Sequence, residues 1–157
     1  MSESAFSTEG LSELAEVIKE WLGAQLRTKT MVQSVEYNHE ERRWYVRISG
    51  EEKDNSMILF TLGQRTLHYE TYVMPAPEEN KSDFFEYLLR KNQKLYGVAF
   101  GIGKEEAIYL TGQVSNQIVK EETLDWILGT LYSAIELCFR PALRLGFASR
   151  FENKSEE

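Results

Sequence analysis

The densest group of residues that could do chemistry is the glycine-rich run Gly97–Lys104, which reads GVAFGIGK. Glycines before a lysine are typical of loops that cradle phosphate. The nucleotide-binding pattern needs another glycine where this chain has Val98, and a serine or threonine where it has Glu105. A carboxylate there would repel phosphate. We therefore expect no nucleotide site, and interpret the glycines as a strand face on which a helix or a neighbouring chain packs closely.

The two histidines and the single cysteine are the remaining candidates for metal binding or nucleophilic catalysis. His39 lies in a predicted turn, His68 in a predicted strand and Cys138 on the flank of a predicted helix. A zinc site needs three or four convergent ligands, and a cysteine nucleophile needs a base beside it. These three residues meet neither condition well, so we expect no metal and no cofactor. Cys138 is interpreted as a small buried apolar residue.

Adjacent glutamates recur along the chain, but only in predicted turns or at the ends of predicted elements. Carboxylate catalysis needs two acids held together on a rigid, partly buried frame. We interpret the pairs as solvated loops and expect the protein not to be an enzyme. The pairs are Glu40-Glu41, Glu51-Glu52, Glu78-Glu79, Glu105-Glu106 and Glu121-Glu122.

Aromatic residues offer a different kind of candidate site. Tyr45, Tyr72 and Tyr109 each fall on the more polar side of a predicted strand, and Arg47 lies on the same side as Tyr45. Tyrosine and arginine are enriched where interfaces derive their binding energy. If helices cover the other side of the sheet, these four residues form an exposed partner-binding face. The alternative is that the tyrosines merely complete a solvated sheet face.

Periodicity supplies the elements that would position these residues. A helical stripe of apolar residues begins after Ser7 or Thr8, and alternating patterns follow it. The order predicts an α+β fold: a helix, a four-stranded antiparallel meander, a helix, a β-hairpin and a C-terminal helix. The predicted ranges are Leu11–Leu26, Met31–Tyr37, Arg43–Ser49, Met57–Leu62, Leu67–Val73, Asn80–Asn92, Leu95–Gly103, Ala107–Val114 and Thr123–Phe139.

Two residues are expected to end helices. Asn92 follows Arg90 and Lys91 and is interpreted as a left-handed C-cap of the short helix begun by Asn80 or Ser82. Pro141 is expected to break or kink the last helix, after which residues 142–147 form either one more turn or an extended arm.

Length and composition limit the class of protein. The 157 residues predict a single domain over 1–157, with an ordered core at about 8–150 and flexible ends at 1–7 and 152–157. The net charge of −7 disfavours nucleic acid and anionic membranes as partners. A lone cysteine suits a reducing compartment, and the sequence shows neither a secretion signal nor a membrane-spanning run. We expect a soluble cytoplasmic protein.

Four motifs in order resemble the YbjN family of bacterial proteins. They are FFEYLLRKN (Phe84–Asn92), YGVAF (Tyr96–Phe100), IYLTGQV (Ile108–Val114) and EETLDWILGTL (Glu121–Leu131), within a match that extends from about Glu40 to Arg150. The family is described as sensory-transduction regulators and is similar in fold to type III secretion chaperones. The resemblance implies helices packed on a curved antiparallel sheet, a homodimer and no catalytic residues. Asn92 is the one polar residue that it carries over.

Three functional hypotheses follow. The first is a chaperone-like or regulatory module that binds a segment of a partner protein without covalent chemistry, either along a strand edge or across the sheet. The second is a small-molecule sensor with a pocket between sheet and helices. The third, an enzyme, has no group of residues to support it.

Overall fold

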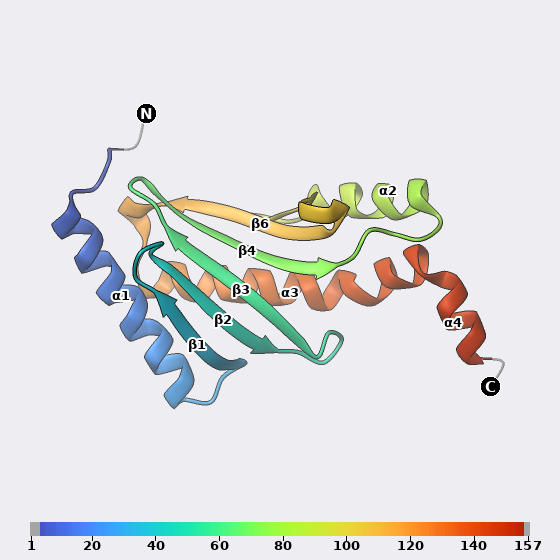
Figure 1. Ribbon diagram of the computed structural model, residues 1–157, viewed down its shortest axis with the longest axis horizontal. Coiled ribbons are helices and arrows are strands. Elements are labelled where there is room, and N and C mark those ends of the chain that lie inside the picture. Colours follow the sequence, from blue (N-terminus) through green and yellow to red (C-terminus); the bar gives the residue numbers. More distant parts are fainter. Residues whose placement is uncertain (1–3, 156–157) are drawn as a thin grey trace.

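The computed structural model describes the backbone of residues 4–155 and the side chains of residues 4–151. A helix, four strands, a second helix, two strands and two further helices follow one another (Figure 1), so the predicted α+β order is confirmed. Short 3₁₀ turns at Lys104–Glu106 and Asn116–Ile118 precede and follow the last strand. The elements are α1 (Thr8–Arg27), β1 (Val32–Asn38), β2 (Arg43–Ser49), β3 (Asn55–Leu62), β4 (Thr66–Met74), α2 (Lys81–Asn92), β5 (Ala99–Ile102), β6 (Ile108–Ser115), α3 (Glu121–Gly146) and α4 (Ala148–Ser155).

All strands of the sheet pair antiparallel, in the order β1-β2-β3-β4-β6-β5. The meander is β1 to β4, and the hairpin of β5 and β6 joins it through the pairing of β6 with β4. The first predicted strand, whose apolar pattern is interrupted by Gln33 and Ser34, forms β1 with a register shift between Val32 and Ser34. That shift is a β-bulge, which accommodates the interruption.

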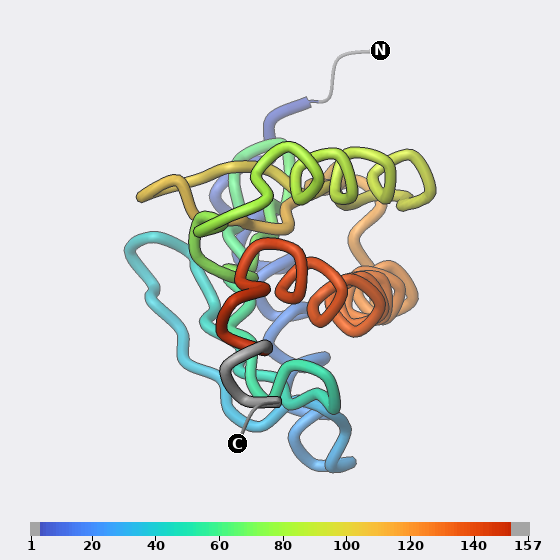
Figure 2. The backbone as a smooth tube through the Cα atoms, turned by 90° about the vertical axis from the view of Figure 1, so that its right-hand side faces the viewer, coloured from blue at the N-terminus to red at the C-terminus, as the bar shows by residue number. Residues whose placement is uncertain are grey.

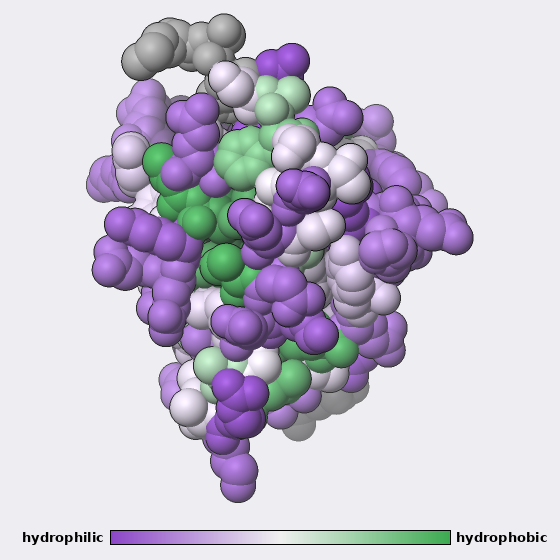
Figure 3. Space-filling model, turned by 90° about the vertical axis from the view of Figure 1, so that its left-hand side faces the viewer, coloured by the Kyte–Doolittle hydropathy of each residue, from purple (hydrophilic) through white to green (hydrophobic). Residues whose placement is uncertain are grey.

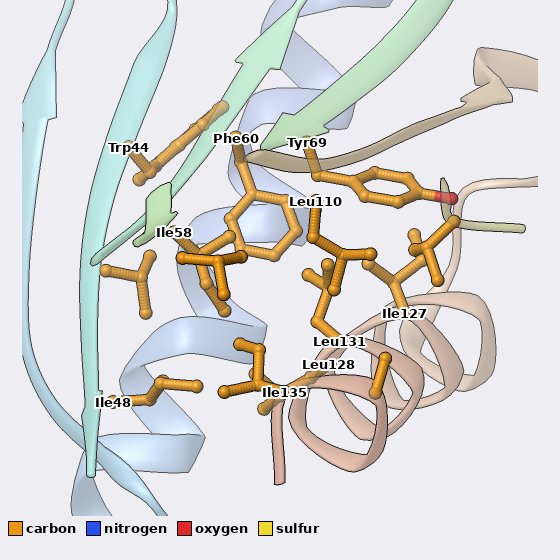
Figure 4. Packing of buried hydrophobic residues seen from close by; sticks show 14 of the residues in the cluster. Trp44, Ile48, Ile58, Phe60, Tyr69, Leu110, Ile127, Leu128, Leu131 and Ile135 are labelled. Atoms are coloured by element: carbon orange, nitrogen blue, oxygen red, sulfur yellow. The ribbon is translucent and has the colours of Figure 1, made fainter. Parts of the chain in front are cut away.

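Helices α1 and α3 cover one face of the sheet, and the core lies between them and the strands. In Figure 1, α3 passes behind the strands and α1 lies along the β1 edge. Figure 4 shows side chains of the sheet and of α3 meeting in this layer. The indole N–H of Trp21 in α1 donates to the Asp125 carboxylate in α3 at 2.8 Å. Buried residues at the centre of the layer are Trp44, Ile58, Phe60, Tyr69, Leu110, Ile127, Leu131 and Ile135.

The predicted start of the first helix is confirmed in detail. Ser7 is the N-cap, and its hydroxyl accepts from the Gly10 N–H at 3.1 Å, which satisfies one of the free donors of the first turn. The apolar stripe turns inward as its spacing predicts. Its buried members are Leu11, Leu14, Ile18, Trp21 and Leu22.

The prediction that Asn92 is a left-handed C-cap is wrong. Asn92 is the last residue of α2, and Gln93 after it has right-handed helical angles. The left-handed residue is Asn80 at the other end, with a φ of 52°. Its side chain makes no cap bond and donates instead to the Leu145 carbonyl at 2.9 Å. Tertiary contacts, rather than local capping, therefore determine the role of both asparagines.

The strand predicted at Leu95–Gly103 is shorter than expected, because β5 begins only at Ala99. Gly97 has a φ of +79°, which is incompatible with an extended strand. Its carbonyl accepts from the Tyr69 hydroxyl at 2.8 Å. The chain therefore turns at Gly97 before it enters the sheet.

Of the outcomes predicted at Pro141, a break is not found: α3 continues through Pro141 to Gly146, which is the further turn predicted for residues 142–147 rather than an extended arm. Proline removes the bond to the carbonyl four residues earlier, which is that of Leu137. Pro141 and Leu137 are both exposed, so water can hydrate that carbonyl. The exposed side of the helix thus tolerates a residue that the buried side would not.

The chain ends described by the structure are attached to the fold. The Phe6 N–H donates to the Gln64 carbonyl at 2.7 Å. In α4, Arg150 makes two hydrogen bonds to the Glu78 carboxylate at 2.8 and 2.7 Å. The flexible ends expected at 1–7 and 152–157 lie partly outside the described residues, which exclude 1–3 and 156–157. Among the helices described, none is long and apolar enough to cross a membrane.

Candidate partner-binding surface

The face of the sheet opposite α1 and α3 carries all four residues predicted to bind a partner. Successive side chains on a strand point to opposite faces. Tyr45 and Arg47 flank Val46, which is fully buried, so both point away from the core. By the same alternation, Tyr72 precedes buried Val73 and Tyr109 precedes buried Leu110.

Tyr72 and Tyr109 form the aromatic centre of this face. They are directly opposite each other on β4 and β6, and their rings meet edge to face with centroids 5.7 Å apart. Tyr72 is 43% exposed and Tyr109 is half-buried. A Cβ at Gly103 would lie 2.4 Å from the Tyr109 ring, so the absence of a side chain at Gly103 is what allows the ring to approach the backbone there.

A groove of about 650 Å³ includes these two tyrosines in its lining. Its floor is largely apolar, and charged side chains of both signs stand around it. Tyr45 and Arg47 lie on the same face but do not line it, although Leu59, directly opposite Tyr45, does. The lining residues are Arg43, Met57, Leu59, Glu70, Thr71, Tyr72, Gly101, Ile102, Gly103, Lys104, Tyr109 and Thr111.

Three apolar members of the groove were not among the predicted site residues. Met57 is 36% exposed and Ile102 is 56% exposed, while Leu59 is half-buried. The sequence does contain a signal for the β3 residues, because this strand is apolar on both faces. That pattern predicts a central strand, which is correct, but here the second apolar face meets the groove rather than a second layer of helices.

The charges around the groove are partly paired. The Arg43 Nε donates to the Thr61 hydroxyl at 2.9 Å, and its guanidinium lies 3.4 Å from the Glu41 carboxylate. Burial raises the pKa of Tyr72 above its ordinary 10.0, and the neighbouring Tyr109 and Glu105 raise it further. Tyr72 is therefore a neutral phenol at pH 7, with a hydroxyl that can donate a hydrogen bond.

The hairpin turn at the rim of the groove has an unusual backbone. Glu105 and Glu106 have φ values of 58° and 61°, a left-handed conformation that side-chain-bearing residues rarely adopt. Strain of this kind is often found beside functional sites. In this hairpin it lies next to Lys104, which lines the groove.

The residues considered for metal binding and catalysis are not brought together. His39 lies at the β1–β2 turn against Tyr37, and His68 lies on β4 opposite Thr61 and Gln113. The described residues contain no group of three or more His, Cys, Asp or Glu side chains that could hold a metal ion. Cys138 is buried, and burial raises the pKa of its thiol above the ordinary 9.0.

Some of the acidic pairs connect elements rather than forming free loops. The backbone N–H groups of Glu51 and Glu52 donate to the Glu136 carboxylate at 2.5 and 2.8 Å, and Glu52 forms an ion pair with Arg140. These contacts attach the β2–β3 loop to α3. Glu78 and Glu79 similarly hold α4.

The end of the molecule at α1 differs from the groove. Figure 3 shows this end as mostly hydrophilic, with apolar surface in separate areas. The exposed apolar residues of α1 are Val17 and Leu26, at 38% and 39%. Neither lines the groove, and α1 offers no aromatic pair comparable with Tyr72 and Tyr109.

By sequence, the chain is similar to uncharacterized mycobacterial proteins. No protein-family model matches the chain. An uncharacterized protein of Mycobacterium tuberculosis is 32% identical over 109 residues, and one of Mycobacterium leprae is 30% identical over 112 residues. These matches include 69% and 71% of this chain but only 60% and 61% of the relatives, so the chain spans about three fifths of their length.

Two solved structures share the fold. One is the ExsC–ExsE complex, with a TM-score of 0.57 and 16% identity over 81% of this chain and 94% of the other. The second is the Yersinia pestis type III secretion chaperone SycH in complex with a stable fragment of YscM2, with a TM-score of 0.52 and 13% identity over 78% and 96%. The predicted likeness to the type III secretion chaperone fold is thereby confirmed.

Proposed function

We propose that this protein is a non-enzymatic, cytoplasmic, chaperone-like or regulatory module that binds a segment of a partner protein on the open face of its sheet. The observation that carries the proposal is the groove around Tyr72 and Tyr109, an apolar and aromatic surface on the sheet face that α1 and α3 leave uncovered. We further propose that the module is a homodimer.

The composition of the groove suits a peptide segment. Met57, Leu59 and Ile102 offer apolar contact, and the tyrosines add large rigid side chains with polar tips. Arg43, Glu70 and Lys104 at the sides can pair with charges of either sign. Aromatic anchors surrounded by a polar rim are the usual composition of a protein interface.

A segment lying across the face has more support than one added to a sheet edge. At the β5 edge, the Asn92 side chain already bonds the N–H and the C=O of Phe100, at 2.7 and 3.1 Å. At the β1 edge, the bulge between Val32 and Ser34 interrupts the regular spacing that an added strand needs. Of the two modes predicted, we therefore propose the one across the sheet.

The two structural neighbours are consistent with this proposal. Each was solved with another polypeptide, ExsE for ExsC and a fragment of YscM2 for SycH. Their low identity to this chain supports the fold alone, and binding of a segment by this chain rests on the groove. We also propose membership of the YbjN family, supported by the four motifs Phe84–Asn92, Tyr96–Phe100, Ile108–Val114 and Glu121–Leu131 in their order.

The alternative of a small-molecule sensor has less support. It places a ligand between sheet and helices, where Phe60, Tyr69 and Leu131 are fully buried side chains of the core (Figure 4). A ligand there would have to displace packed side chains, and such repacking costs about 1–3 kcal/mol.

Affinity capture with matched variants tests the proposal. The tagged chain is used to isolate partners from its native cytoplasm, alongside Tyr72→Ala/Tyr109→Ala and the control Leu89→Ala, which truncates a side chain 65% exposed on α2. We expect a partner that the wild type and Leu89→Ala retain and the double variant loses. Equal capture by all three proteins, with the double variant folded, would show that the partner does not bind in the groove.

A further inference from the structure

A second feature, distinct from the sheet groove, lies on the outer side of α3. A trough of about 410 Å³ follows three turns of this helix, and the segment Lys94–Tyr96 forms its wall. Figure 2 shows α2, which leads into that segment, beside α3. Large side chains line the two ends of the trough, and small side chains line its middle. The α3 residues in it are Trp126, Gly129, Thr130, Ser133, Ala134 and Leu137.

The side chains at the ends of the trough are unusually exposed for their size. Leu137 is 60% exposed, Trp126 is 36% exposed and Tyr96 is 79% exposed. Tyr96 and Trp126 meet edge to face with ring centroids 5.4 Å apart. In the middle, a Cβ at Gly129 would meet no atom within 4 Å, so the surface there is open. Large exposed aromatic and aliphatic side chains around an open centre indicate an interaction surface.

The spacing places these residues on one stripe of the helix. Trp126, Ser133 and Leu137 recur at seven and four residues, which is the period of one helix face. Extended by one to two turns, the stripe reaches Glu122 at its N-terminal side and Arg140 and Arg144 at its C-terminal side, all exposed. The stripe therefore has opposite charges at its two ends.

We propose that this stripe is the surface through which two copies of the chain pair, with their α3 helices antiparallel and Ser133 on the two-fold axis. The inference rests on the homodimer proposed above and specifies its interface. In an antiparallel pair, each residue faces the residue that lies equally far on the other side of Ser133. The sequence of the stripe is complementary to itself under this operation.

Three contacts between the two α3 helices support this pairing, and the two-fold symmetry makes each contact occur twice. Leu137 faces Gly129 of the second copy, so a large side chain enters the open position. Trp126 faces Arg140 of the second copy. Arg140 forms an ion pair with Glu52 of its own chain, and both side chains are about half exposed. A planar guanidinium can keep such a pair at its edge while its face lies over an indole, which is a favourable cation–π contact.

The third contact is between opposite charges. Glu122 faces Arg144 of the second copy. Within one chain, Glu122 lies 3.7 Å from Lys120, and both side chains are more than two-thirds exposed. Such an exposed pair contributes little, so Glu122 can exchange this partner at little cost.

The small side chains at the middle of the stripe favour a helix, rather than an extended segment, as the element that packs on it. Two helices pack with their axes 8–10 Å apart, and small residues at the crossing favour the lower end of that range. Gly129 and Ser133 supply such a crossing point. A dimer formed here would also cover Tyr96 and Trp126 and leave the sheet groove of each copy free, because the groove lies on the opposite face of the sheet from α3.

Sedimentation equilibrium of the full chain and three variants tests the inference. Gly129→Leu places a large side chain at the open position, where an added Cβ meets no atom within 4 Å. Glu122→Arg places like charges together across the axis, and Glu122→Arg/Arg144→Glu restores opposite charges. We expect a wild-type dimer, a dissociation constant at least about tenfold weaker for the first two variants, and recovery in the double variant. Leu89→Ala, outside the stripe, should behave as the wild type.

The outcomes separate this inference from the proposed segment binding. A wild-type chain that remains monomeric at all concentrations overturns the inference, as does a dimer that is insensitive to Gly129→Leu and Glu122→Arg. In both cases the Tyr72/Tyr109 capture experiment is unaffected. Urea unfolding of each variant excludes misfolding as the cause of dissociation, and the charge-reversed double variant supplies a gain of association that misfolding could not produce.

Discussion

The Asn92 side chain pairs with the backbone of Phe100 as a neighbouring strand would. Its Oδ1 accepts from the Phe100 N–H at 2.7 Å, and its Nδ2 donates to the Phe100 carbonyl at 3.1 Å. One residue at the end of α2 thus satisfies the outer edge of β5 and holds the helix against the sheet. The result is an edge that is less available to another chain.

Replacing Asn92 should destabilise the fold. Asn92→Ala leaves a partly buried N–H and C=O of Phe100 without their partner, which costs about 1–3 kcal/mol. Urea unfolding measures the change, with Gln93→Ala as the neighbouring control, since Gln93 is exposed. An Asn92→Ala protein as stable as Gln93→Ala would show that water replaces the side chain without loss.

Two glycines in the same segment should respond very differently to alanine. A Cβ at Gly97 would lie 2.1 Å from the Trp126 ring, and the residue also has a φ of +79°, whereas a Cβ at Gly101 meets nothing within 4 Å. We expect Gly97→Ala to lower the free energy of unfolding by more than about 2 kcal/mol through overpacking and backbone strain, and Gly101→Ala to change it by less than about 0.5 kcal/mol. Thermal or urea unfolding of the pair decides, and equal stabilities would contradict the tight packing of Gly97 on α3.

Replacing Glu105 in the β5–β6 turn with glycine should stabilise the protein. Glu105 has a φ of 58°, which costs a non-glycine residue about 1–2 kcal/mol, while glycine costs about 0.5–1 kcal/mol in chain entropy. Glu105→Gly should therefore raise stability by about 0.5 kcal/mol, and Lys104→Gly, where φ is not positive, should lower it. If Glu105→Gly stabilises the protein but weakens partner capture, the strain at the groove rim has a role in binding. Destabilisation by Glu105→Gly would contradict the left-handed turn.

The stability contributed by Glu136 should depend on pH. Partial burial by itself would raise the pKa of this carboxyl, but the backbone N–H donors of Glu51 and Glu52 outweigh it, with Tyr132 and Lys53 adding to them, and the pKa lies below its ordinary 4.5. A carboxyl with a lowered pKa in the folded state stabilises the protein above its unfolded pKa and loses that contribution as pH falls through the folded value.

Comparison of the wild type with Glu136→Gln measures this contribution. The difference in urea midpoint should be constant from pH 7 to about pH 5 and should shrink below about pH 4.5. Glu41→Gln in the β1–β2 turn is the matched control, since its half-exposed carboxylate forms a single ion pair, with Arg43. A Glu136 difference that grows as pH falls would contradict the assignment.

The alternation of the strands and the stripes of the helices predict the fold, because both follow from local period alone. Tyr72 and Tyr109 could be placed on the outer face for the same reason. The groove itself could not be predicted, since it depends on β6 lying between β4 and β5, and only that order brings Ile102 and Lys104 towards Met57. The local rule for a left-handed C-cap fails at Asn92, because the distant backbone of Phe100 determines its role. At Pro141 local rules leave a break and a further turn both open, and the exposed side of the helix allows the further turn.

Photo-crosslinking from inside the groove tests whether a partner segment binds there. A photoreactive phenylalanine analogue at Met57, 36% exposed on the groove floor, is compared with the same group at Leu89, 65% exposed on α2. Cross-linked peptides are then identified by mass spectrometry from native cytoplasm. We expect a recurrent segment of one partner protein attached at residue 57 and not at residue 89. Attachment at residue 89 alone, or at neither position while a partner is still captured, would contradict binding on the open face of the sheet.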